Sequence, residues 1–181
     1  ELKEDQIEDI YPMTPMQEGL MFHTLFKPNS GIYVMQYCYE LQGTFNHPAF
    51  IQAGQMVVAQ HPILRTSFMR LEERPMQIVH KPKDVKTVNS AHEQSPVTVL
   101  DWRKQWQNQS PDTSQAQLQH WLKTKLHQGF DLHRPTQLAI TLIQIADDRY
   151  LLVRSFHHIL MDAWCFSLLM NDFMRAYQGI C

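Results

Sequence analysis

Cysteine is scarce in this sequence of 181 residues, and the three cysteines, Cys38, Cys165 and Cys181, lie far apart. No two of them form a C-x-x-C pair, so the sequence offers neither a disulfide framework nor a cysteine-based zinc site. The formal net charge is also small, −2 with histidine neutral. It therefore gives no electrostatic reason to expect nucleic acid or an anionic membrane as a partner. The few, unpaired cysteines predict a reducing, cytoplasmic setting.

Long apolar runs are missing as well. No stretch approaches the roughly 18 apolar residues that a membrane span needs, and no basic and then apolar signal segment opens the chain. Hydrophobic residues nevertheless make up 44% of the sequence and charged residues 19%, which is ordinary for a globular domain with a sizeable core. The chain begins with Glu1 rather than Met and stops at Cys181, so we expect a segment of a longer polypeptide.

Local patterns predict a mixture of helices and strands. Capping residues followed by apolar stripes indicate helices over residues 15–26, from about 47 to 58, from about 118 to 129, and over 163–177. Aromatic and branched runs indicate strands over 33–41, 63–69, 76–80, 97–100, 137–145 and 150–156, the last two forming a hairpin. Residues 1–10 are expected to be a lead-in, 105–114 a surface loop, and 82–96 have no firm pattern. Together these elements predict an α+β, two-layer sandwich with a mixed, largely antiparallel sheet.

The residues best suited to chemistry are His157 and His158, followed by Asp162, where an apolar strand gives way to a helix. Adjacent residues of an extended segment point to opposite sides, so one histidine should face the interior and its neighbour a cavity. An imidazole there can accept a proton or stabilise an oxyanion. From residue types alone, other interpretations stay open: a satisfied core histidine with Asp162 as a helix cap, or a metal site, for which no third ligand has suitable spacing.

Several strings resemble one family. The segment from His157 to Ala163 resembles the H-H-x-x-x-D-G motif of nonribosomal peptide synthetase condensation domains, with alanine in place of glycine. Tyr11 to His23 resembles the family's opening motif. Gln60 to Phe68 resembles the second motif, usually R-H-x-x-L-R-T-x-F, and Gly129 to Pro135 resembles its F-D-L-x-x-x-P stretch. The matches follow the family's order and cover the chain from about residue 7 to its end.

The resemblance implies that residues 1–181 are the N-terminal lobe of a condensation domain with a chloramphenicol acetyltransferase-like fold, its C-terminal lobe being absent. In this family two lobes enclose a tunnel, and an amide forms between two thioesters delivered there. No cofactor is expected to bind directly, because phosphopantetheine arms of carrier proteins deliver the substrates. The expected partners are the upstream and downstream peptidyl carrier proteins, the C-terminal lobe and a neighbouring adenylation domain. We expect the isolated half to be inactive.

The resemblance also assigns roles to residues. His158 is the expected catalytic residue, acting as a base toward the acceptor amine or by positioning it and stabilising the intermediate. His157 is expected to be structural, and Asp162 is expected to form an ion pair with Arg65 that holds the loop. Tunnel lining is expected of the following residues: Met16, Gln17 and Gly19 on the acceptor side, and Trp164, for which, as for Phe166, a core position is the stronger expectation.

Subtype and alternatives follow from smaller differences. The string Pro-Met-Thr-Pro-Met-Gln-Glu-Gly resembles condensation domains that accept a D-configured donor. An epimerisation domain of the same superfamily is an alternative, although it usually continues D-G-x-S-W, whereas the tryptophan here follows Asp162 by two residues. A cyclising relative would have aspartates in place of the histidines. A CoA-dependent acyltransferase and a non-catalytic, carrier-binding or structural fragment remain further alternatives.

Overall fold

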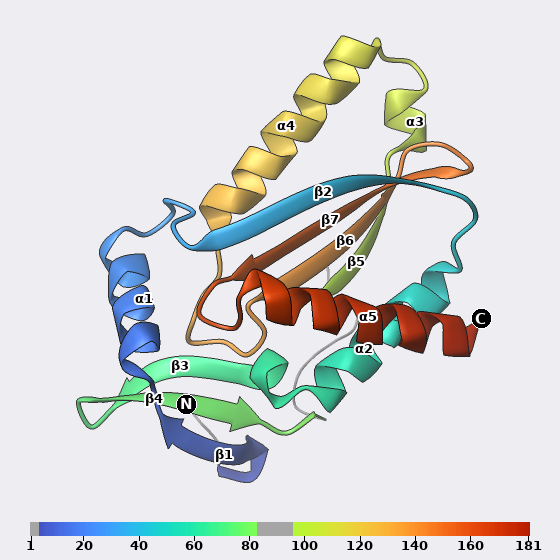
Figure 1. Cartoon of the computed structure of the whole chain (residues 1–181). Coiled ribbons are helices and arrows are strands. Elements are labelled where there is room, and N and C mark those ends of the chain that lie inside the picture. The colour runs from blue at the N-terminus through green and yellow to red at the C-terminus, as the bar shows by residue number, and fades with distance from the viewer. Residues whose placement is uncertain (1–3, 83–95) are drawn as a thin grey trace.

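The computed structural model describes residues 4–82 and 96–181, which form two β-sheets with helices packed around them (Figure 1). The 4-stranded sheet has the order β2-β7-β6-β5, with the bounds Val34–Gln42, Arg149–His157, Leu138–Gln144 and Val97–Asp101. The 3-stranded sheet has the order β1-β4-β3, with the bounds Ile7–Pro12, Arg74–His80 and Thr66–Leu71. Neighbouring strands are antiparallel except β5 and β6, which are parallel. The predicted α+β class with a mixed, largely antiparallel sheet is confirmed.

Helices lie on both faces of the larger sheet (Figure 1). On one face are α2, His47–Gln60, and α5, Ala163–Ile180; on the other is α4, Pro111–Gln128, preceded by the short α3, Arg103–Trp106. Helix α1, Pro15–Phe26, stands beside the end of the sheet where β7 finishes. Short 3-10 turns, Glu4–Gln6 and Pro62–Arg65, precede β1 and β3. No helix within the described residues is long and apolar enough to cross a membrane.

Strand β7 shows how the sequence accommodates helices on both faces. Tyr150, Leu152 and Phe156 belong to the core cluster that α2 and α5 complete. Leu151 and Val153 belong to a second cluster on the α4 side. Because side chains alternate across a strand, a strand buried on both faces must be almost continuously apolar. The alternation continues to the end of β7, so it determines which sides the two histidines at that end occupy.

The signals that start and stop helices account for α1 and α4. Thr14 caps α1 and forms a capping box with Gln17, as predicted. Helix α4 ends at Gly129, whose φ of 60° suits glycine. Ser110 caps α4 and Pro111 opens it, so the surface loop predicted over 105–114 is wrong at both its ends. The missed signal is a Ser-Pro pair of the same kind as Thr14-Pro15.

The N-terminal residues correct a second prediction. Residues 1–10 are predicted as a lead-in, but Ile7–Pro12 form strand β1 against β4. Five of its six residues are exposed, so no apolar pattern announced it; backbone pairing with β4 holds it. The strand predicted over 63–69 begins at Thr66, after a 3-10 turn. The unpatterned segment 82–96 lies almost wholly outside the described residues.

Candidate functional site

The candidate site is the turn between β7 and α5, which carries residues 158–162. Its backbone is anchored on both sides. His158 donates its N–H to the carbonyl of Tyr33 (2.8 Å), and Leu160 donates to the carbonyl of His157 (3.1 Å). Ile159 and Leu160 are buried, at 3% and 7% exposure. A turn anchored by backbone hydrogen bonds and by two buried side chains is a rigid support for its remaining residues.

His157 is the inner residue of the pair and has 0% exposure. Its Nδ1 accepts a hydrogen bond from the backbone N–H of Ile159 (3.1 Å), and its Nε2 lies 2.9 Å from the hydroxyl of Thr24 on α1. Burial, and to a lesser extent the charge of the neighbouring His158, lowers the pKa of His157 to about 4. This imidazole is therefore neutral at neutral pH and tied to its surroundings at both nitrogens, as expected of a structural histidine.

His158 is the outer residue and is exposed. No hydrogen bond between described residues engages its imidazole, so both ring nitrogens are open to an incoming group. The predicted division of the pair, one histidine inward and one outward, is present in the structure. An imidazole held on a rigid turn and free at both nitrogens can take a proton from an amine or donate a hydrogen bond to an oxyanion.

Asp162 has a local role in the turn. Its carboxylate caps α5 by accepting the backbone N–H of Cys165 (2.8 Å). Hydrogen bonds from Cys165 hold the pKa of Asp162 below its ordinary value. Ala163 begins the helix and is not among the residues with positive φ, so the alanine that replaces the motif's glycine is unstrained.

The predicted ion pair between Asp162 and Arg65 is wrong. Arg65 is buried, at 3% exposure. Its Nη1 donates to the carboxylate of Glu8 (2.7 Å) and to the carbonyl of His80. The physical reason lies in the strand that the sequence pattern missed: β1 brings Glu8 alongside the smaller sheet. Arg65 thus stabilises the junction of β1, β3 and β4, and the turn is held without it.

The other predicted site residues occupy two exposed surfaces. Met16 is 77% exposed on α1, and a Cβ at Gly19 would meet nothing within 4 Å. Gln17 is half-buried and donates to the side chain of Gln77 (3.3 Å) besides its part in the capping box. Trp164 is 76% exposed, so its expected core position is wrong and tunnel lining stays a prediction. Phe166 is in the core, as predicted.

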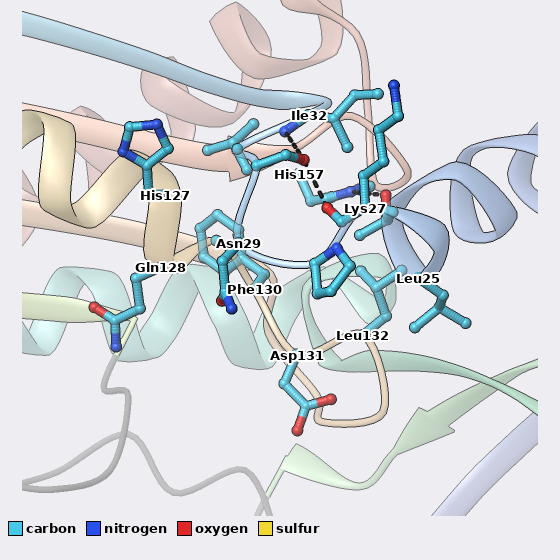
Figure 2. Close-up of a pocket in the computed structure, with 16 residues that line it drawn as sticks. Leu25, Lys27, Asn29, Ile32, His127, Gln128, Phe130, Asp131, Leu132 and His157 are labelled. Atoms are coloured by element: carbon cyan, nitrogen blue, oxygen red, sulfur yellow. Dashed lines mark hydrogen bonds between the residues drawn. The ribbon is translucent and has the colours of Figure 1, made fainter.

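A pocket lies on the His157 side of the turn (Figure 2). It has a volume of about 250 Å³ and lies between the end of α1 with its following loop and the end of α4 with residues 129–132. His157 contributes to its wall, and His158 is not among its lining residues. The pocket is therefore separate from the exposed imidazole. Across residues 4–82 and 96–181, no cluster of three or more His, Cys, Asp or Glu side chains could hold a metal ion.

Two residues at the site were not predicted. Thr24 contacts His157 from α1, and Glu8 pairs with Arg65. Thr24 lies three residues after the buried Met21, so helical spacing places it on the inner face of α1 and could have indicated that its hydroxyl has an interior partner. Glu8 lies in an exposed strand without an apolar pattern, and nothing in the sequence indicated its partner.

Solved structures with the same fold define the class of protein. The starter condensation domain of rhizomide synthetase superposes with a TM-score of 0.77 at 19% identity, covering 96% of this chain and 38% of that chain. The first condensation domain of the CDA synthetase superposes with a TM-score of 0.76 at 18% identity, covering 96% of this chain and 40% of that chain. The fold is therefore that of condensation domains.

Sequence comparison supplies the family. The family model named condensation domain matches residues 7–180. The linear gramicidin synthase of Brevibacillus parabrevis contains a polypeptide that is 38% identical over 174 residues, covering 96% of this chain and 3% of the relative. Tyrocidine synthase 3 of Brevibacillus parabrevis is 31% identical over 182 residues, covering 98% of this chain and 2% of the relative. The chain belongs to the condensation-domain family of nonribosomal peptide synthetases and spans a small fraction of the relatives it matches.

Proposed function

We propose that this chain is the N-terminal lobe of a condensation domain that joins a donor aminoacyl or peptidyl thioester to the amine of an acceptor aminoacyl thioester. Both substrates are carried on the phosphopantetheine arms of peptidyl carrier proteins, and the domain itself binds no cofactor. The observation that carries the proposal is His158, an exposed imidazole without a partner among the described residues, on a turn anchored by its backbone. The matched family model supports the reaction class.

The reaction forms one C–N bond and breaks one C–S bond. The acceptor amine attacks the donor carbonyl, the resulting intermediate carries an oxyanion and an ammonium, and its collapse releases the donor thiol. His158 takes the proton from the nitrogen, or it positions the amine and stabilises the intermediate. An α-amine has a pKa of about 8, so part of it is already neutral near pH 7, and positioning is an effective contribution.

The site is completed by surfaces outside this chain. Trp164 and Leu168 lie one helical turn apart on α5 and are 76% and 54% exposed. Apolar side chains exposed next to a functional turn indicate contact with another protein surface. We propose that the C-terminal lobe covers them, since the similar solved condensation domain of the CDA synthetase is a longer chain, of which this chain covers 40%. The neighbouring adenylation domain and the two carrier proteins are the further proposed partners.

The compartment that we propose is the cytoplasm. The described cysteines Cys38, Cys165 and Cys181 are free and exposed. Free, exposed thiols persist in a reducing environment. Retention of all three thiols in protein isolated from its cell under alkylating conditions is the expected result; a disulfide among them would contradict this assignment.

Amide formation is the test of the proposed function. The complete condensation domain that contains this chain is mixed with one carrier protein loaded with a donor thioester and a second loaded with an acceptor thioester. We expect a carrier-bound amide, detected by mass spectrometry, that disappears when either loaded carrier is omitted. No amide with any loaded pair from the parent synthetase would contradict the proposal. Residues 1–181 alone are expected to give none, and turnover by this chain alone would show that the second lobe is dispensable.

The proposed subtype accepts a D-configured donor and an L-configured acceptor. The support is the string from Pro12 to Gly19, which forms the start of α1 and its cap. Matched donor carriers that differ only in the configuration of the terminal residue separate the subtypes. We expect the D-donor to be consumed faster than the L-donor, and a preference for the L-donor would contradict the assignment.

A further inference from the structure

His157 uses both ring nitrogens, and the partner of one determines the state of the other. The backbone N–H of Ile159 is only a donor, so Nδ1, at 3.1 Å, must present a lone pair to it. A neutral imidazole with a bare Nδ1 carries its proton on Nε2. The Ile159 amide thus selects the Nε2–H tautomer of this buried ring.

The Nε2–H proton needs an acceptor, and Thr24 supplies it. Its Oγ1 lies 2.9 Å from Nε2. The same hydroxyl donates its own proton to the carbonyl of Leu20 (2.8 Å), which leaves an oxygen lone pair directed to the imidazole. The hydrogen bonds therefore run in one direction: from Ile159 to His157, from His157 to Thr24, and from Thr24 to Leu20. Every donor in this chain has an acceptor, as a fully buried polar group requires.

We propose that Thr24 is a positioning residue for His158: from α1 it fixes the tautomer and orientation of His157, which in turn fixes the backbone that carries His158. The proposal rests on the proposed function only for the consequence on catalysis. His158 stands between His157, whose ring is held by Thr24, and Ile159, whose amide is held by that ring. Displacement of the ring therefore reaches the peptide groups on both sides of the exposed imidazole.

A valine at position 24 removes the acceptor while preserving the side-chain shape. The buried Nε2–H is then unsatisfied, because the described residues place no other acceptor within hydrogen-bonding distance of it, and the ring must change its tautomer, rotate or admit water. A serine keeps the hydroxyl and loses only a methyl group. Thr24→Val and Thr24→Ser thus separate the hydrogen bond from packing on the inner face of α1.

The test has a spectroscopic arm that does not depend on activity. Long-range ¹⁵N–¹H spectra of the chain labelled in its histidine rings report the tautomer of each imidazole, and His157→Asn identifies the His157 signals. We expect pure Nε2–H in the wild type and in Thr24→Ser, and loss of that pattern in Thr24→Val. An Nδ1–H tautomer in the wild type overturns the proposal without any variant, so a poorly folding Thr24→Val leaves it testable.

The kinetic arm uses the complete domain with two loaded carriers. Thr24→Val is expected to lower kcat roughly ten- to a hundred-fold, with the KM for the acceptor carrier little changed, because misplacement of a reacting group costs rate more than binding. Thr24→Ser is expected to stay within about threefold of the wild type. Equal kcat for the valine and serine variants overturns the proposal. A wild-type domain that forms no amide instead contradicts the proposed function, and the tautomer result stands apart from it.

Discussion

The two sides of the histidine turn differ in how completely this chain satisfies them. On the inner side, His157 has 0% exposure and a hydrogen bond at each ring nitrogen. On the outer side, His158 is exposed without a side-chain partner among the described residues, and Trp164 is 76% exposed. The inner side is a finished piece of protein interior, whereas the outer side presents reactive and apolar groups to other surfaces. Stability and reactivity are therefore assigned to opposite sides of one short turn.

The largest effect is expected from the inner side. Phe156 is 1% exposed and stacks on Phe166 with ring centroids 4.6 Å apart. Phe156→Ala is expected to lower the free energy of unfolding by about 4 kcal/mol, because it removes a buried ring and leaves a cavity. Urea denaturation monitored by circular dichroism measures the change. A loss below about 1 kcal/mol would show that this side is not close-packed.

Acid should weaken the inner side through His157. Its folded-state pKa of about 4 lies below its unfolded value of about 6.5, so the unfolded chain binds a proton at a pH where the folded protein does not. Stability from this group is therefore intact above about pH 6.5 and declines as the pH falls to about 4, by about 3 kcal/mol in all. Urea titrations from pH 7.5 to 4 measure the decline.

His157→Asn provides the variant for this comparison, and the exposed His127→Gln is its matched control. The asparagine variant should lose less stability between pH 6.5 and 4 than the wild type does, while the control should follow the wild type. Identical pH dependence in all three proteins would mean that His157 titrates normally and is not the buried, neutral residue described above.

The partner of Arg65 can be determined by two double-mutant cycles. Arg65→Met combined with Glu8→Gln should show a coupling energy of about 1–2 kcal/mol, reduced by the partial exposure of Glu8. Arg65→Met combined with Asp162→Asn should show none, because no ion pair or hydrogen bond joins those two side chains. Coupling to Asp162 and not to Glu8 would restore the ion pair expected from the family.

The cap of α5 should have a smaller effect. Asp162→Ala removes the acceptor for the Cys165 amide and is expected to lower the melting temperature by about 3 °C. Asp162→Asn should stay close to the wild type, since asparagine caps helices as well as aspartate does. Scanning calorimetry measures both. A large loss with asparagine would indicate that the charge, and hence an ion pair, matters.

The smallest effect is expected on the outer side. Trp164→Ala should change the free energy of unfolding of this chain by less than about 0.5 kcal/mol, because the ring is exposed. Phe166→Ala, two residues away and buried, is the matched control and should cost several times more. If Trp164→Ala were as destabilising as Phe166→Ala, the ring would be part of the core after all.

The difference between the two sides also explains what the sequence could predict. The β7 run, the cap at Thr14 and the stripe of α5 follow from local periodicity, and all three are present. The opposite orientations of His157 and His158 follow from the alternation along a strand. The partners of Arg65 and of His157 could not be predicted, because they depend on where β1 and α1 lie in space. Trp164 shows the same limit, since a large apolar residue on a helix does not disclose which faces remain uncovered.

Amide formation by the complete domain carrying His158→Ala tests the central claim most directly. The loss of a positioned acid–base group should slow the single-turnover reaction between two loaded carriers by about a hundredfold or more. The melting temperature should stay within about 1 °C of the wild type, because the His158 side chain supports nothing in the fold. Undiminished amide formation, or unfolding of the variant, would contradict the assignment of reactivity to the outer side of the turn.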